Sequence, residues 1–84
     1  MIKKYMLFFT PMCPKCPKIK EYMDTKGLEK EWVDAATKEG LEKAREFGVS
    51  GVPTAIFFDE NKEEASRATD IEEIKKIVEN QTLN

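Results

Sequence analysis

Residues 8–17 read FFTPMCPKCP and place two cysteines just beyond a strongly apolar run. That run, YMLFF at residues 5–9, is typical of a strand that is covered on both of its faces. Residues 10–12 end the strand, and we expect a helix to begin at about Pro14, because proline fits the first turn of a helix. The sequence therefore predicts a C-x-x-C pair at a strand-to-helix junction.

The two cysteines, Cys13 and Cys16, are predicted to form a redox-active disulfide. Thiolate is the nucleophilic form of cysteine, and a helix N-terminus stabilises an anion. Lys15 and Lys18 add positive charge, so the pKa of a thiol here can fall to about 3.5–7.5. We expect Cys13 to attack a substrate disulfide as the nucleophile. Cys16, one turn deeper, is expected to resolve the mixed disulfide, and both are the predicted catalytic residues.

Other uses of the cysteine pair have less support. The loop between the cysteines is too short to restrict the unfolded chain strongly, which argues against a structural staple. Zinc usually takes four ligands, and the chain has no histidine and only two cysteines. We therefore expect neither a metal nor a cofactor in one chain. A zinc site shared by two chains remains the alternative from another functional class, and a docking domain without activity would not need both thiols.

The rest of the chain predicts one α/β domain over residues 1–84. Strands are expected at residues 3–9, 29–34, 54–58 and 63–67, and helices from about Pro14 to Gly27, from Thr37 to Gly48 and after Asp70. Two helical stripes, Leu41/Ala44/Phe47 and Ile71/Ile74/Ile77, are predicted to lie in the core. The single tryptophan, Trp32, is also expected to pack in the core rather than to touch a substrate.

With these motifs the chain resembles the thioredoxin superfamily, on residues 8–16 and on GVSGVPT at residues 48–54. The resemblance implies a thioredoxin-like α/β fold of the minimal glutaredoxin type, β-α-β-α-β-β-α, with a four-stranded mixed central sheet and three helices. It also implies that Pro53 is cis and faces the cysteines, with the backbone before it open to an extended substrate. The substrate-binding residues expected from this resemblance, and for Met12 and Val52 also from their nearness to the two motifs, are Met12, Pro14, Lys15, Val52, Pro53 and Thr54.

Within the superfamily the chain is similar to two branches. Its length and its Cys-Pro-Lys-Cys motif resemble glutaredoxins, whereas GVPTAIFF at residues 51–58 resembles thioredoxins. Residues 65–70 lack the glycines with which glutaredoxins help to hold glutathione, and Leu7 stands where thioredoxins carry a buried acid. We expect a thioredoxin-like activity on a glutaredoxin-sized frame. A glutathione-dependent glutaredoxin is the alternative.

Composition and charge limit the classes of partner that we expect. The net charge of −2, from 14 basic and 16 acidic residues, gives no electrostatic footprint for nucleic acid. No apolar run is long enough for a secretory signal or a membrane span, so we expect a cytoplasmic protein without a membrane partner. The expected partners are protein disulfides and a reductase, thioredoxin reductase-like rather than glutathione-linked. Some relatives donate electrons to ribonucleotide reductase. Nothing in the sequence demands more than a monomer.

Overall fold

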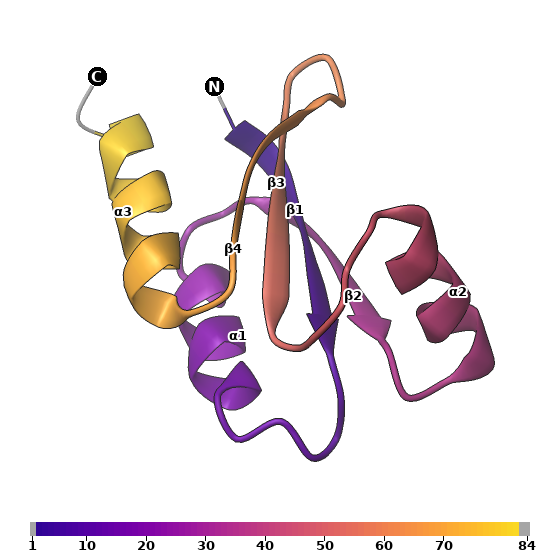
Figure 1. The fold of residues 1–84 in the computed structure, drawn as a ribbon. Helices are drawn as coiled ribbons and strands as arrows, with labels where there is room; N and C mark the ends of the chain where they lie inside the picture. The colour runs from indigo at the N-terminus through magenta and orange to yellow at the C-terminus, as the bar shows by residue number, and fades with distance from the viewer. Residues whose placement is uncertain (1, 83–84) are drawn as a thin grey trace.

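The chain folds into a four-stranded sheet with three helices (Figure 1). The structure, a computed structural model, describes residues 2–82, and side chains to residue 80. The elements are β1 (Ile2–Phe9), α1 (Cys16–Asp24), β2 (Glu29–Asp34), α2 (Lys38–Glu46), β3 (Thr54–Asp59), β4 (Glu64–Ala68) and α3 (Ile71–Thr82). This confirms the predicted mixed sheet and element order. That one domain spans residues 1–84 stays a prediction, since residues 1, 83 and 84 lie outside the described residues.

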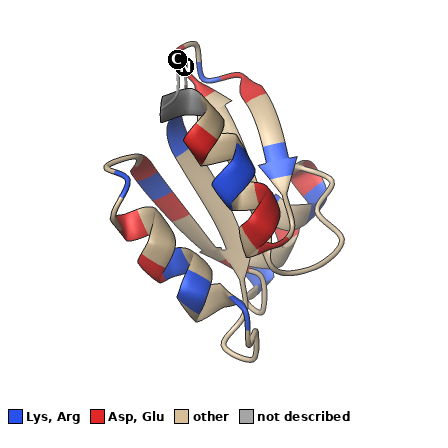
Figure 2. Ribbon diagram, turned by 90° about the vertical axis from the view of Figure 1, so that its left-hand side faces the viewer, with Lys and Arg blue, Asp and Glu red and all other residues tan. Residues whose placement is uncertain are grey.

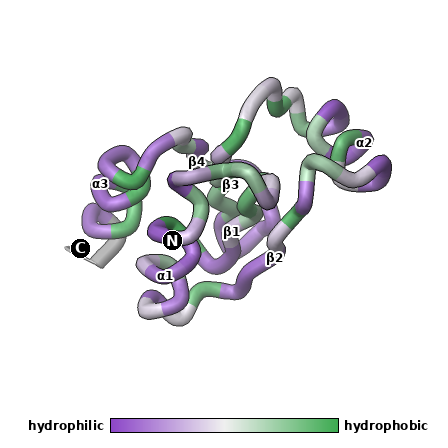
Figure 3. The backbone as a smooth tube through the Cα atoms, turned by 90° about the horizontal axis from the view of Figure 1, so that it is seen from below, coloured by the Kyte–Doolittle hydropathy of each residue, from purple (hydrophilic) through white to green (hydrophobic). Residues whose placement is uncertain are grey.

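The two central strands, β1 and β3, are covered on both faces. The sheet order is β2-β1-β3-β4, with β1 parallel to β2 and antiparallel to β3. Helices α1 and α3 pack on one face and α2 packs on the other (Figures 1 and 3). Because side chains alternate along a strand, Tyr5 and Leu7 join the cluster under α1 and α3, whereas Met6 and Phe8 join the cluster under α2. The continuous apolar run of β1 therefore serves two separate clusters.

The register between β1 and β3 brings two distant loops together. Phe8 of β1 stands opposite Thr54, the first residue of β3, in an antiparallel pair. The chain leaves β1 after Phe9 and enters β3 at Thr54, so the cysteine loop and the loop ending at Pro53 emerge from the same end of the sheet. This end of the sheet carries the candidate site.

Helix α1 begins at Cys16, so the prediction that it begins at about Pro14 was wrong. Pro17 lies in the first turn and has no N–H, so it cannot donate the helical hydrogen bond back to the carbonyl of Cys13. The bond from Ile19 to the carbonyl of Lys15, at 3.5 Å, begins the helix. Cys13 consequently precedes the helix by three residues instead of lying at or just before its first position.

Helix α2 approaches the sheet through its small residues. Thr37 caps the helix as predicted, accepting a hydrogen bond from the N–H of Gly40 at 2.9 Å. Gly40 and Ala44 are buried, and a Cβ atom at Gly40 would overlap the carbonyl oxygen of Asp34. Because this close contact fixes the rotation of the helix, Leu41 is 45% exposed, and its predicted place in the core was wrong.

Trp32 lies at the edge of the sheet, and its predicted core position was also wrong. Its side chain is 37% exposed, because β2 is an edge strand and no further strand covers it. The indole N–H donates to the hydroxyl of Tyr5 at 2.9 Å. Lys20 and Lys30 lie over the ring, at 4.5 and 4.4 Å from it, in cation–π contacts. The ring thus packs against lysine side chains.

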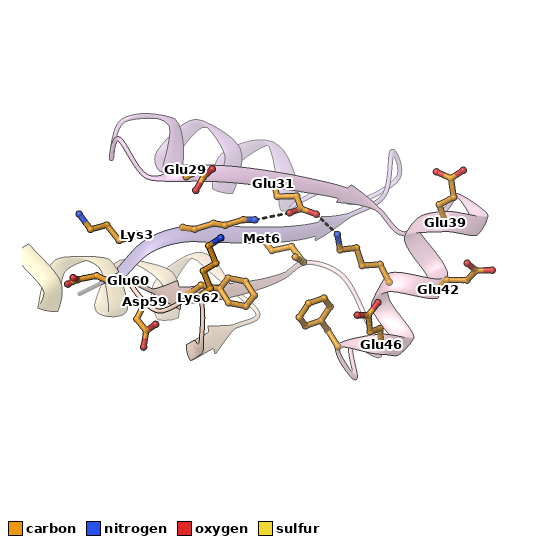
Figure 4. Close-up of a pocket in the computed structure, with 14 residues that line it drawn as sticks. Lys3, Met6, Glu29, Glu31, Glu39, Glu42, Glu46, Asp59, Glu60 and Lys62 are labelled. Atoms are coloured by element: carbon orange, nitrogen blue, oxygen red, sulfur yellow. Dashed lines mark hydrogen bonds and ion pairs between the residues drawn. The ribbon is translucent and has the colours of Figure 1, made fainter.

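A partly buried carboxylate, that of Glu31, joins β1, β2 and α2. Its oxygens accept hydrogen bonds from Lys4 of β1 at 3.0 Å and from Lys43 of α2 at 2.5 Å. The Glu31 carboxylate lies in a groove of about 700 Å³ on the α2 face. Glu39 and Glu42 also line this groove, but their side chains point away from Glu31 (Figure 4). The hydrogen bonds from Lys43 and Lys4 hold the pKa of Glu31 below its usual value of 4.5. Since α2 leads into the loop that ends at Pro53, this contact helps to place the site.

We expect the Glu31→Gln variant to lose about 1 kcal/mol of unfolding free energy at pH 7. Because the pKa of Glu31 is lowered by folding, its ion pairs stabilise the fold above the unfolded pKa and lose this effect as the pH falls through the folded pKa. Urea unfolding should therefore show a difference at pH 7 that shrinks at acidic pH. Glu29→Gln, on the same strand, is the matched control. An equal loss in both variants at every pH would contradict the assignment.

Candidate active site

The two cysteines form a disulfide at the end of β1. Cys13 and Cys16 are bonded through sulfur, with Cα atoms 5.5 Å apart. A turn follows the strand, in which the N–H of Cys13 donates to the carbonyl of Thr10 at 3.1 Å. Cys16 is 2% exposed within the first turn of α1, and Cys13 is 8% exposed. Cys13 is the cysteine nearer to solvent.

A hollow of about 400 Å³ opens beside Cys13. It is lined by Cys13, Pro14, Lys15, Ser50, Gly51, Val52, Pro53, Thr54 and Thr69. Every predicted substrate-binding residue except Met12 contributes to this lining, and Cys16 does not. Met12 is 88% exposed on the turn before Cys13 and does not line the hollow.

The lining includes three residues that the sequence reasoning did not select. Ser50 and Gly51 lie within the motif at residues 48–54, so that motif could have indicated them. Thr69 follows β4, and only the position of β4 beside β3 brings it near Cys13. No local signal in the sequence marks Thr69.

The loop opposite Cys13 ends in a cis peptide bond between Val52 and Pro53, as the resemblance implied. The loop begins after α2 at Gly48, whose φ of +68° lies in the left-handed region that glycine adopts readily. Pro53 is buried, whereas Val52 is half-buried. The cis bond, the half-buried Val52 and Cys13 therefore border one hollow.

Two side chains hold this loop at its ends. The Thr54 hydroxyl donates to the carbonyl of Gly51 at 2.7 Å, so it points into its own loop. At the other end, Arg67 of β4 donates to the carbonyl of Phe47 at 3.0 Å. Arg67 also pairs with Glu64 at 2.7 Å, and hydrogen bonds from Arg67 lower the pKa of the Glu64 carboxyl. The loop is thereby anchored to both β3 and β4.

The residue six positions before Cys13 is apolar. Leu7, where thioredoxins carry an acid, is fully buried in the cluster under α1 and α3. A proton leaving Cys16 therefore has no carboxylate at this position to accept it.

Among residues 2–80, no three His, Cys, Asp or Glu side chains are grouped as a metal site. The described helices include none long and apolar enough to cross a membrane.

Comparison with known proteins identifies the family. The glutaredoxin family model matches residues 5–62. The chain belongs to the glutaredoxin family. A protein of Archaeoglobus fulgidus named probable thioredoxin is 40% identical over an alignment of 58 residues that covers 63% of this chain and 63% of that protein. The glutaredoxin chain therefore matches less than two thirds of this relative's length.

Solved structures show a thioredoxin fold for this glutaredoxin-family chain. Thioredoxin O2 from Arabidopsis thaliana, in the oxidised state, superposes with a TM-score of 0.78 at 20% identity, over 94% of this chain and 74% of that one. Thioredoxin 1 from Thermosipho africanus gives a TM-score of 0.73 at 23% identity, over 94% and 90% of the two chains.

Thr54→Val should loosen the loop opposite Cys13, because valine keeps the shape of threonine but cannot donate to Gly51. We expect a loss of about 1 kcal/mol in the free energy of unfolding, and faster amide hydrogen exchange in residues 50–52. Thr54→Ser keeps the hydroxyl and serves as the control. If valine and serine give the same exchange rates, the hydroxyl does not order this loop.

Proposed function

We propose that this protein reduces disulfides in other proteins by dithiol exchange. The observation that carries the proposal is the hollow shared by Cys13 and the cis Val52–Pro53 segment. An extended substrate strand can hydrogen-bond to the backbone before Pro53 and so present its disulfide to Cys13. Pro14, Lys15, Val52, Pro53 and Thr54 are the proposed substrate-binding residues in this hollow, with Met12 on the exposed turn beside it.

The reaction starts from the reduced dithiol. The Cys13 thiolate attacks one sulfur of the substrate disulfide, forms a mixed disulfide and expels the other substrate sulfur as a thiolate, which takes up a proton. Cys16 then loses its proton and attacks the Cys13 sulfur. This step expels the second substrate thiol and leaves Cys13 and Cys16 oxidised. Two electrons pass from the protein to the substrate; Cys16 supplies one of the two protons that the substrate gains, and solvent supplies the other.

Charge and burial support this division of roles. Cys13 lines the hollow while Cys16 lies in the first turn of α1, so a substrate sulfur reaches Cys13 first. Lys15 lies beside Cys13 in the same lining, and positive charge favours the thiolate form of a cysteine. Because Leu7 stands where an acid would be, the proton of Cys16 leaves through water, Lys18 or the departing substrate thiolate.

For the electron donor we propose a reductase of the thioredoxin reductase type. The support is residues 65–70, which carry no glycine and lie in β4 and the turn before α3. The family match favours the second candidate, a glutathione-dependent glutaredoxin. We further propose a cytoplasmic monomer, with ribonucleotide reductase among the enzymes that it could supply with electrons.

The Cys16→Ser variant should accumulate mixed disulfides, because Cys13 can still attack while no second thiol remains to resolve the product. Mass spectrometry after incubation with a disulfide peptide should show the peptide attached to Cys13. The Cys13→Ser variant is the control and should form no such adduct. If Cys16→Ser turns over at the normal rate without an adduct, Cys16 is not the resolving thiol.

Re-reduction of the oxidised protein should distinguish the two donors. We expect thioredoxin reductase with NADPH to reduce it rapidly, and glutathione with glutathione reductase and NADPH to reduce it at least about tenfold more slowly. NADPH consumption measures both rates. Fast reduction by glutathione alone would overturn the proposed donor and establish the glutaredoxin alternative. Reduction by dithiothreitol serves as the positive control.

A further inference from the structure

In the segment that carries the cysteines, every charged residue is basic. Residues 10–20 contain three lysines and no aspartate or glutamate. Lys15 lines the hollow beside Cys13, and Lys18 lies three positions further along α1; both side chains are exposed. Figure 2 shows basic residues gathered at the end of α1 nearest the cysteine loop and acidic residues toward its other end. The basic rim, defined here as Lys15 and Lys18, therefore has one lysine in the lining of the hollow and one in the adjoining first turn of α1.

Neither lysine of the basic rim forms an ion pair with a described residue. The ion pairs among the described residues use Lys4, Lys30, Lys43 and Arg67, and none uses Lys15 or Lys18. Like charges three positions apart at the start of a helix are unfavourable, since that end carries the positive pole of the helix dipole. Helices α2 and α3 instead have acidic residues in their first turns. Fold stability does not explain the lysines at the start of α1.

The opposite wall of the hollow has no cation and no charged residue in its loop. Ser50 to Thr54 are uncharged, and Thr69 adds a hydroxyl. The acids that follow are engaged by their own turn: Asp70 accepts from the N–H of Glu73 at 2.9 Å, and Glu73 accepts from the N–H and the hydroxyl of Thr69 at 3.1 and 3.0 Å. The lysines therefore lie on the α1 side of the hollow, opposite a loop without charge.

We propose that the basic rim selects protein disulfides that carry carboxylates beside the reacting cysteine. This inference rests on the proposed disulfide reduction and names its substrate class. A carboxylate of the docked segment would pair with Lys15 or Lys18 while its disulfide meets Cys13. An exposed ion pair of this kind changes binding by up to about fivefold. Two such pairs favour an acidic over a neutral segment by roughly tenfold, and the preference is screened by salt.

Three peptides of one design test the proposal. Each carries the same disulfide, flanked by two aspartates, two asparagines or two lysines. We expect kcat/KM to be about tenfold higher for the aspartate peptide than for the asparagine peptide at about 0.01 M salt, and lowest for the lysine peptide. The differences should fall to within about twofold at about 0.5 M salt. Equal values at low salt would overturn the selection, whereas reduction of none of the peptides would overturn the proposed function itself.

Charge reversal then identifies the residues responsible. Lys15→Glu/Lys18→Glu should invert the order, so that the lysine peptide becomes the best substrate. A change in Cys13 reactivity alters all three rates together, so the ratio between peptides isolates the effect on docking. Lys3→Glu, at the far end of β1, carries the same kind of charge change and should keep the original order. An unchanged ratio in the double variant would assign the preference to other residues and refute the role of the basic rim.

Discussion

The antiparallel pairing of β1 with β3 is the constraint on which the rest of the structure depends. It sets Phe8 opposite Thr54, and both strands are buried on both faces. A shift of one residue would move every side chain of β1 to the other face and exchange the two apolar clusters. It would also displace Pro53 relative to Cys13. Core packing and the assembly of the site therefore rest on the same register.

Much of the fold was predictable because its signals are local. The apolar run of β1, the strand at residues 29–34 and the Thr37 cap each depend on neighbouring residues. The predictions were wrong where contacts between distant parts of the chain determine the structure. Leu41 is exposed because Gly40 and the carbonyl of Asp34 fix the rotation of α2. Helical periodicity shows that a helix has an apolar side, but it does not show which residues touch the sheet.

The candidate site was predictable as far as its motifs extend. The cysteine motif and the motif at residues 48–54 supplied every lining residue except Thr69, although Ser50 and Gly51 were not selected. The predicted start of α1 was wrong because both Pro14 and Pro17 suit the first turn of a helix. Pro17 occupies that turn, and without an N–H it cannot donate a hydrogen bond to the carbonyl of Cys13. Thr69 and the hydrogen bond from Arg67 to Phe47 depend on the path of β4, which no short motif records.

The position of Trp32 at the edge of the sheet determines which part of the structure its fluorescence reports. It is the single tryptophan of the chain and belongs to neither apolar cluster; it donates to Tyr5 at the border of the cluster under α1 and α3, and Lys20 and Lys30 lie over its ring. Tryptophan fluorescence therefore senses the junction between α1 and β2 instead of the protein interior. A local separation of that junction changes the emission spectrum while the core is still packed. Emission and circular dichroism followed together during heating can then distinguish fraying of this edge from global unfolding.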